Sequence, residues 1–142
     1  MIDLENLIKQ TKSLKLLYVE DNKDVTETTL FILEDLFDDI LIAVDGKDGL
    51  NKFKNNKIDL VLTDIDMPNM DGLEMSKAIK QININQPIIV LTAITDIKDI
   101  KEANDIDIDS FIYKPISDIN ILFNKIEECV KKMNNNKELK EK

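Results

Sequence analysis

The sequence predicts one α/β domain in which five parallel strands alternate with five helices. Five short apolar runs recur along the chain, and each is followed by polar residues. Segments with a helical spacing of apolar residues separate the runs. Because crossovers between parallel strands are short and right-handed, this alternation requires a three-layer, doubly wound sheet with helices on both faces. Its natural strand order is 2-1-3-4-5.

The composition is that of a single globular domain. The chain has 142 residues, of which 43% are hydrophobic and 33% charged, and this length is sufficient for a real core. No stretch approaches ~18 consecutive apolar residues, and the N-terminal residues lack the apolar segment of a signal peptide. The single cysteine, Cys129, excludes an internal disulfide and fits a reducing compartment. We therefore expect a cytoplasmic protein without a membrane segment.

Histidine and arginine are both missing, and their absence excludes several functions. There is no histidine, which removes Ser-His-Asp and Cys-His catalysis and histidine-ligated zinc sites. There is no arginine either, so all 19 basic residues are lysines, set against 28 acidic residues for a net charge of -9. Such a field repels nucleic acid, and bidentate readout of guanine by arginine is unavailable to the chain. We expect no direct binding of nucleic acid.

The first half of the chain predicts a helical extension and then three strands. Residues 1–13 carry apolar residues at helical spacing. The strands are expected at 14–19, 40–44 and 58–63. A helix from Val25 joins the first two, and we expect Asp24 to be its N-cap. Leu50 and Phe53 mark the inner face of a shorter helix before the third strand.

The second half of the chain predicts two more strands and three helices. A helix follows Gly72, and the fourth strand covers residues 88–91. A weak helix at about 96–104 precedes the fifth strand at 110–113. The last helix begins near Asp118, its expected N-cap, and extends to about Met133. We assign the domain to residues 14–133 and expect the polar residues 134–142 to be frayed, disordered or the start of a linker helix.

The predicted topology gathers polar residues at one edge of the sheet, where open α/β sheets place their ligands. Strand 14–19 ends in Glu20 and Asp21, and strand 58–63 is followed by Asp64. The fourth strand leads to Thr92 and the fifth to Lys114. Carboxylates packed together repel one another and raise their pKa values unless a cation joins them. An oxygen-rich site without histidine or cysteine suits a hard ion, and Mg²⁺ is preferred because it needs only one or two carboxylates.

The same residues are those that phosphoryl transfer requires. A carboxylate can act as the nucleophile and form an aspartyl phosphate. Mg²⁺ and a lysine can neutralise charge on the transferring group, and a threonine hydroxyl can hydrogen-bond a phosphate oxygen. A structural ion pair between Lys114 and Asp64 is the simpler alternative, and it is compatible with this chemistry.

At this point the chain resembles the receiver domain of bacterial response regulators. Four separated motifs carry the resemblance, in the order and at the spacings of that family: YVED ending at Asp21, TDIDMPNMDG around Asp64, LTA with Thr92, and FIYKP with Lys114. It covers residues 14–133, nearly the whole chain. The flavodoxin-like strand order 2-1-3-4-5 is characteristic of this family, so it is not independent of the resemblance.

The resemblance implies a phosphoacceptor and a set of metal ligands. Asp64 is similar to the phosphoacceptor, which also contacts the metal. Asp21 resembles a direct Mg²⁺ ligand, Glu20 one that acts through water, and Asp66 one that offers its backbone carbonyl. Mn²⁺ can substitute for Mg²⁺ in such a site.

The resemblance also implies a switch. Thr92 is similar to the switch hydroxyl, and Lys114 to the lysine that contacts the phosphoryl group. Lys114-Pro115 would carry the family's cis peptide. The switch aromatic is Phe111 and not Tyr113, because it lies three residues before the lysine. Phenylalanine has no hydroxyl, so the implied switch works by packing alone.

The chain departs from the family pattern in two places. Residues 105–109, DIDID, stand where a Gly-Ala pair is usual, and Gly49 stands where alanine is common. Both are expected away from the site. The first puts in question the shape of the surface near the strand at 110–113, which many family members use for output.

The resulting hypothesis is a phosphorylation-activated signalling switch and not an enzyme with its own substrate. The phosphoryl donor would be a sensor histidine kinase or a phosphotransfer protein. The output face would be formed by the helix at 96–104, the strand at 110–113 and the last helix, and would bind a target protein or effector domain. A stand-alone chain, a piece of a longer regulator or hybrid kinase, and a dimer remain open.

Two functional alternatives also remain. Asp64-Ile-Asp66 matches the D-x-D of haloacid-dehalogenase-type phosphatases. In that family, however, the nucleophile follows the first strand, and an acidic pair follows the fourth. The other alternative is an interaction module that keeps the fold but does not need phosphorylation; the complete acidic, threonine and lysine set argues against it.

Overall fold

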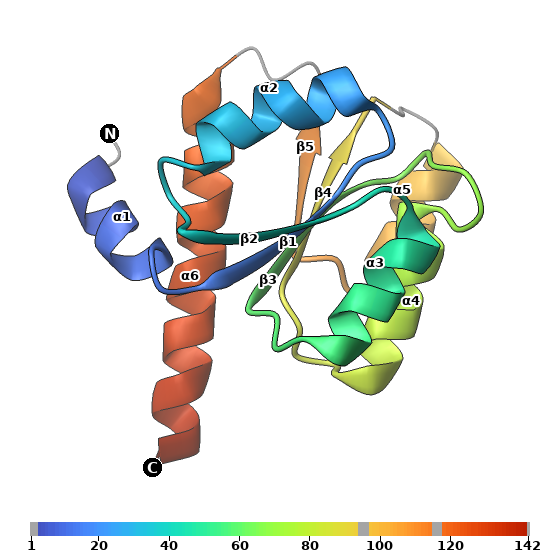
Figure 1. Cartoon of the computed structure of the whole chain (residues 1–142). Coiled ribbons are helices and arrows are strands. Elements are labelled where there is room, and N and C mark those ends of the chain that lie inside the picture. Colours follow the sequence, from blue (N-terminus) through green and yellow to red (C-terminus); the bar gives the residue numbers. More distant parts are fainter. Residues whose placement is uncertain (1–2, 94–96, 115–117, 142) are drawn as a thin grey trace.

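The computed structural model describes residues 3–93, 97–114 and 118–141, and it has the expected α/β fold (Figure 1). The strands are β1 Lys15–Val19, β2 Asp39–Ala43, β3 Leu60–Asp64, β4 Ile88–Thr92 and β5 Ser110–Tyr113. The helices are α1 Leu4–Thr11, α2 Lys23–Leu33, α3 Gly46–Asn55, α4 Gly72–Ile82, α5 Ile97–Ile106 and α6 Ile119–Glu141. Helices α2 to α6 follow the five strands in turn, and α1 is an addition before β1.

The strands form one parallel sheet in the order β2-β1-β3-β4-β5, which confirms the predicted topology. Strands β1 and β3 are neighbours, and Val19 lies opposite Thr63 in their register. The next residue of each strand path is acidic, Glu20 after β1 and Asp64 at the end of β3. The register therefore brings these two carboxyl groups to the same point of the sheet edge.

Two apolar cores, one on each face of the sheet, hold the three layers together. Helices α1, α2 and α6 contribute Leu7, Leu33 and Leu122 to the first core, against Leu16, Tyr18 and Leu62 of the sheet. Helices α3, α4 and α5 contribute Phe53, Met75 and Ala103 to the second, against Leu17, Val61 and Val90. Alternate residues of the central strands thus face opposite layers, and buried strands of this kind read as continuous apolar runs.

Helix α1 belongs to the first core. Leu7 is fully buried, and the Thr11 hydroxyl donates a hydrogen bond of 2.6 Å to the backbone oxygen of Leu36. Figure 1 shows α1 beside α6, with which it is in contact. Among the described residues, no helix is both long and apolar enough to cross a membrane.

Helix α6 continues to Glu141, through the polar segment for which we expected fraying, disorder or the start of a linker helix. That segment contains no glycine or proline that would end a helix. In Figure 1 the C-terminal part of α6 extends beyond the other elements.

Some predicted boundaries were wrong by one or two residues. The N-cap of α2 is Asn22 and not Asp24, because the Asn22 side chain accepts hydrogen bonds from the backbone N–H groups of Asp24 and Val25. Asp24 lies in the first turn, where its charge still favours the helix. Strand β3 begins at Leu60 and includes Asp64 as its last residue.

Candidate functional site

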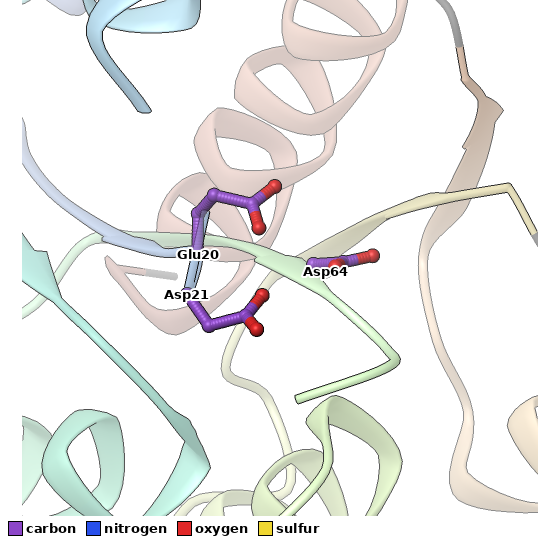
Figure 2. Close-up of side chains that lie close together, drawn as sticks. All are labelled: Glu20, Asp21 and Asp64. Carbon is purple, nitrogen blue, oxygen red and sulfur yellow. The ribbon is translucent and has the colours of Figure 1, made fainter. Parts of the chain in front are cut away.

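Three carboxylates meet at the carboxyl end of the sheet. Glu20 and Asp21 directly follow β1, and Asp64 ends β3. One carboxylate oxygen from each lies within 4.8 Å of the others, and Figure 2 shows the three side chains turned toward a common space. Glu20 and Asp64 are buried and Asp21 is exposed, so the cluster has one side open to solvent.

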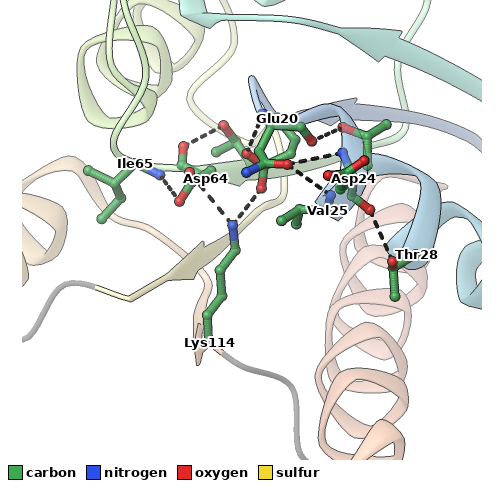
Figure 3. A network of polar contacts seen from close by, with 10 residues as sticks. Glu20, Asp24, Val25, Thr28, Asp64, Ile65 and Lys114 are labelled. Carbon is green, nitrogen blue, oxygen red and sulfur yellow. Dashed lines mark hydrogen bonds and ion pairs between the residues drawn. The ribbon is translucent and has the colours of Figure 1, made fainter.

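Lys114 supplies the positive charge of the site. It follows β5, and its Nζ lies 2.5 Å from Glu20 Oε1 and 3.6 Å from Asp64 Oδ2. Figure 3 shows the lysine reaching both carboxylates. The expected Lys114–Asp64 ion pair is present, but the shorter contact is made with Glu20.

Backbone N–H groups orient the two buried carboxylates. Asn22 donates to Glu20 Oε2 at 3.2 Å, and Ile65 donates to Asp64 Oδ1 at 2.9 Å. Asn22 is also the N-cap of α2, so the start of this helix is tied to the site. Asp64 therefore has one oxygen held by the backbone and the other on the side of Lys114.

Burial makes the ionised form of the cluster costly. It raises the pKa of Asp64 to about 6, and the charges of Glu20 and Asp21 act in the same direction, while Lys114 and the Ile65 N–H oppose them. The pKa of Asp21 is also raised, first by partial burial and then by its hydrogen bond with Glu20. The positive charge of Lys114 alone does not offset the burial and mutual repulsion of the carboxylates around Asp64.

This donor set fits a hard divalent cation. It offers only oxygen ligands, closely spaced and open to solvent on one side, which suits an ion that keeps several waters. The raised pKa values of Asp64 and Asp21 show that added positive charge would stabilise their ionised forms. Asp66, the other predicted ligand, lies two residues after Asp64, and its side chain is exposed and outside the cluster.

The loop between β3 and α4 is closed at its base. Gly72 donates its backbone N–H to Ile65 O at 2.8 Å. A Cβ on Gly72 would lie 1.9 Å from the backbone oxygen of Asp64, so only glycine allows this approach. Asp71 then caps α4 through a capping box with Glu74, as expected for a turn that starts a helix.

Sequence reasoning missed two residues that hold the tip of this loop. Asn69 donates from Nδ2 to Asp45 Oδ2 at 2.8 Å, and the other Asp45 oxygen accepts the N–H of Asp48 as the N-cap of α3. Asn69 has a φ of 68°, a region where asparagine is enriched. The Pro-Asn dipeptide marks a turn, but no local pattern indicates a partner 24 positions earlier in the chain.

The predicted switch residues lie on neighbouring strands, with Phe111 opposite Val90, two residues before Thr92. Thr92 ends β4 and is 2% exposed, and its backbone oxygen accepts a hydrogen bond from the backbone N–H of Lys114 at 2.9 Å. Phe111 lies on β5 and packs, partly buried, against the core formed with α3, α4 and α5. Tyr113 is 53% exposed. The predicted cis peptide involves Pro115, which lies outside the described residues.

Both departures from the family pattern have structural counterparts away from the carboxylates. Asp107 has a φ of 68°, and Asp109 forms ion pairs with Lys80 and Lys132, at 3.6 and 3.1 Å, near the opposite edge of the sheet. Gly49 lets α3 approach β1, because a Cβ there would lie 2.6 Å from the Met75 sulfur and 3.0 Å from a Val19 methyl group.

Comparison with known proteins gives a family match over most of the chain. The sequence model of the response regulator receiver domain matches residues 16–127. The response regulator ArlR of Staphylococcus saprophyticus is 37% identical over 118 residues, which cover 83% of this chain and 53% of ArlR. The CAI-1 autoinducer sensor kinase/phosphatase CqsS of Vibrio cholerae is 33% identical over 127 residues, covering 87% of this chain and 18% of CqsS.

A solved structure matches the fold as well. In the crystal structure of the CheX-CheY-BeF3-Mg+2 complex from Borrelia burgdorferi, the matched chain superposes with a TM-score of 0.75 at 27% identity. The match covers 82% of the present chain and 89% of that chain. The likeness therefore extends over the sheet and its helices.

Proposed function

Because the chain belongs to the response regulator receiver domain family, we propose that it is a phosphorylation-dependent signalling switch whose phosphoacceptor is Asp64. One observation carries the proposal. A buried carboxylate at the end of β3 lies within 4.8 Å of two further carboxylates and 3.6 Å from a lysine. That is the arrangement of charge that phosphoryl transfer to a carboxylate requires.

Glu20, Asp21 and Asp64 would hold Mg²⁺, or Mn²⁺ in its place, with Asp66 offering its backbone carbonyl and Glu20 acting through water. The ion would supply charge neutralisation for the carboxylates and for the incoming phosphoryl oxygens. The oxygen-only donor set supports this assignment, as does the presence of Mg and BeF3 in the structure of a relative.

The transfer itself is a substitution at phosphorus. A carboxylate oxygen of ionised Asp64 forms the new P–O bond as the P–N bond of a donor phosphohistidine breaks, and the bonding electron pair stays on the imidazole nitrogen. Lys114, which already contacts Glu20 and Asp64, is placed to bind a phosphoryl oxygen. Later hydrolysis, by the domain or a phosphatase, restores the carboxylate.

Phosphorylation adds about −1.5 to −2 charge and new acceptor oxygens at a site that already carries excess negative charge. Thr92, next to this edge on β4, donates a hydrogen bond from its hydroxyl to a phosphoryl oxygen. Phe111 repacks on β5. The surface formed by α5, β5 and α6 then changes its preference for a target protein or effector domain, as a shift between two populations.

The partners follow from the chemistry of donor and surface. The donor is a sensor histidine kinase or a phosphotransfer protein, and the net charge of -9 disfavours direct binding to nucleic acid. The chain spans about half the length of ArlR and less than a fifth of CqsS. We propose that it works in the cytoplasm, either alone or as the receiver part of a longer regulator or hybrid kinase.

Labelling with acetyl phosphate and Mg²⁺ tests the proposal. Wild-type protein should gain one acid-stable, hydroxylamine-sensitive phosphoryl group, and Asp64→Asn should gain none. Asp24→Asn is the matched control, because Asp24 is acidic and near the site but outside the carboxylate cluster. Undiminished labelling of Asp64→Asn would refute the assignment. Steady hydrolysis of a generic phosphate ester would instead support the phosphatase alternative.

A further inference from the structure

We infer that Asp45 and Asn69 are positioning residues for the metal site, although neither belongs to the carboxylate cluster. The inference rests on the proposed function and deepens it. Asp45 lies in the turn between β2 and α3, and Asn69 at the tip of the loop between β3 and α4. Their side chains join two segments that are otherwise separate in the chain.

The loop of residues 65–71 needs such a support because it is strained at its tip. Met70 donates its backbone N–H to Pro68 O at 2.7 Å, which closes a three-residue turn around Asn69. A turn of this kind with positive φ is rare and costly. Asn69 has a φ of 68° and is exposed, so burial of its own side chain does not hold this conformation.

The neighbouring turn supplies two hydrogen bonds that hold the loop tip in this conformation. Asn69 Nδ2 donates to Asp45 Oδ2 at 2.8 Å, and the backbone N–H of Gly46 donates to Met70 O at 3.0 Å. The second bond requires close approach, since a Cβ on Gly46 would lie 2.4 Å from Met70 O. Asp45 is 9% exposed, and its second oxygen is fixed by Asp48 at 2.7 Å, so it is a rigid acceptor.

Asp66 lies between two fixed points of this loop. On one side, Ile65 is tied to Asp64 and to Gly72. On the other, Met67 is buried and the tip is held by Asp45. The direction of the Asp66 carbonyl, proposed to face the metal, is therefore set by the closed base and by the Asp45–Asn69 bond together. Mutation of residues that orient a metal ligand in this way typically lowers metal affinity by about 10- to 100-fold.

Two substitutions separate positioning from helix capping and backbone strain. Serine also caps helices, so Asp45→Ser keeps the bond to the Asp48 N–H but leaves no second carboxylate oxygen for Asn69. Asn69→Gly removes the same bond while keeping a residue that tolerates positive φ. Phe53→Leu is the control, because it weakens the packing of α3 in the same core but removes no hydrogen bond of the loop.

The experiment measures the Mg²⁺ dissociation constant by NMR titration of the full chain, together with hydrogen exchange of the Met70 amide. We expect Asp45→Ser and Asn69→Gly each to raise the dissociation constant by about 10-fold. The double variant should bind Mg²⁺ no more weakly than the single variants, because both substitutions remove the same hydrogen bond. Met70 exchange should accelerate in all three. Phe53→Leu should leave the constant unchanged.

Other outcomes decide against the inference in distinguishable ways. If wild type binds Mg²⁺ in an Asp21-dependent manner and both loop variants bind it equally well, the positioning role is wrong and the proposed function stands. If Phe53→Leu weakens Mg²⁺ as much as the loop variants, the effect is general instability and the inference also fails. If wild type shows no Asp21-dependent binding, both the inference and the proposed metal site fail.

Discussion

Replacing Asp64 with asparagine should stabilise the metal-free protein at neutral pH. Burial and two neighbouring carboxylates raise the pKa of Asp64 from its ordinary 3.8 to about 6 in the folded chain. Each pKa unit corresponds to about 1.4 kcal/mol, so keeping this group ionised costs the folded state up to about 3 kcal/mol. Asparagine has no charge, and its amide oxygen can still accept the Ile65 N–H.

The sign of the effect gives the test a built-in control. A folded pKa above the unfolded one means that the stability from this group is fully present below 3.8 and is lost as pH rises through about 6. We therefore expect the free energy of unfolding of Asp64→Asn to exceed that of wild type by about 1–3 kcal/mol near pH 7. The difference should vanish only below about pH 3, where Asp64 is protonated in both the folded and the unfolded state.

Urea denaturation at several pH values, without and with Mg²⁺, measures this difference. Mg²⁺ should stabilise wild type much more than the variant, because a ligand that binds only the folded state stabilises it by RT ln(1 + [L]/Kd), which increases with affinity. A variant that is less stable than wild type near pH 7, or a difference that does not change with pH, would refute the reasoning about Asp64.

Three further predictions concern the site, the added helix and the loop. At limiting Mg²⁺, the rate of acetyl phosphate labelling should fall as pH drops through about 6, the pKa of Asp64, and added Mg²⁺ should move this midpoint lower; a flat pH profile of the rate would contradict it. Leu7→Ala should lower the free energy of unfolding by about 3 kcal/mol, because it leaves a cavity in the core. Leu4→Ala, at a position 42% exposed, should lower it by under about 1 kcal/mol. Equal losses in thermal or urea unfolding would argue against docking of α1. Gly72→Ala should lower stability by about 2 kcal/mol and weaken Mg²⁺ binding, because its Cβ would lie 1.9 Å from the Asp64 backbone oxygen. In Gly49→Ala the new Cβ meets a flexible methionine side chain and a valine methyl group. This variant should therefore lose less stability and keep its Mg²⁺ affinity unchanged.

The parts of this fold that follow from local sequence were predictable. The three central strands, β1, β3 and β4, are continuous apolar runs because both of their faces are buried. Asp64 lies at the end of β3, as its position after such a run indicates. The gathering of Glu20, Asp64 and Lys114 follows from the strand order, which the resemblance also supplied. Their roles in phosphoryl transfer stay predictions.

What the sequence did not indicate depends on contacts between distant segments. Asp24 and Asn22 are both good N-caps, and only the backbone path after β1 selects Asn22. The Asp45–Asn69 bond links two turns that no periodic pattern relates. The continuation of α6 to Glu141 was also left open, because a run of polar residues without glycine or proline is compatible with either a helix or a frayed end.

The central claim is that Asp64 accepts a phosphoryl group, and borohydride trapping tests it most directly. Borohydride reduces an aspartyl phosphate to homoserine, which peptide mass spectrometry locates. After incubation with acetyl phosphate and Mg²⁺, we expect homoserine at position 64 alone, and none when Mg²⁺ is removed by a chelator. Homoserine at another aspartate, or its absence from position 64 in protein that has taken up phosphate, would contradict the account.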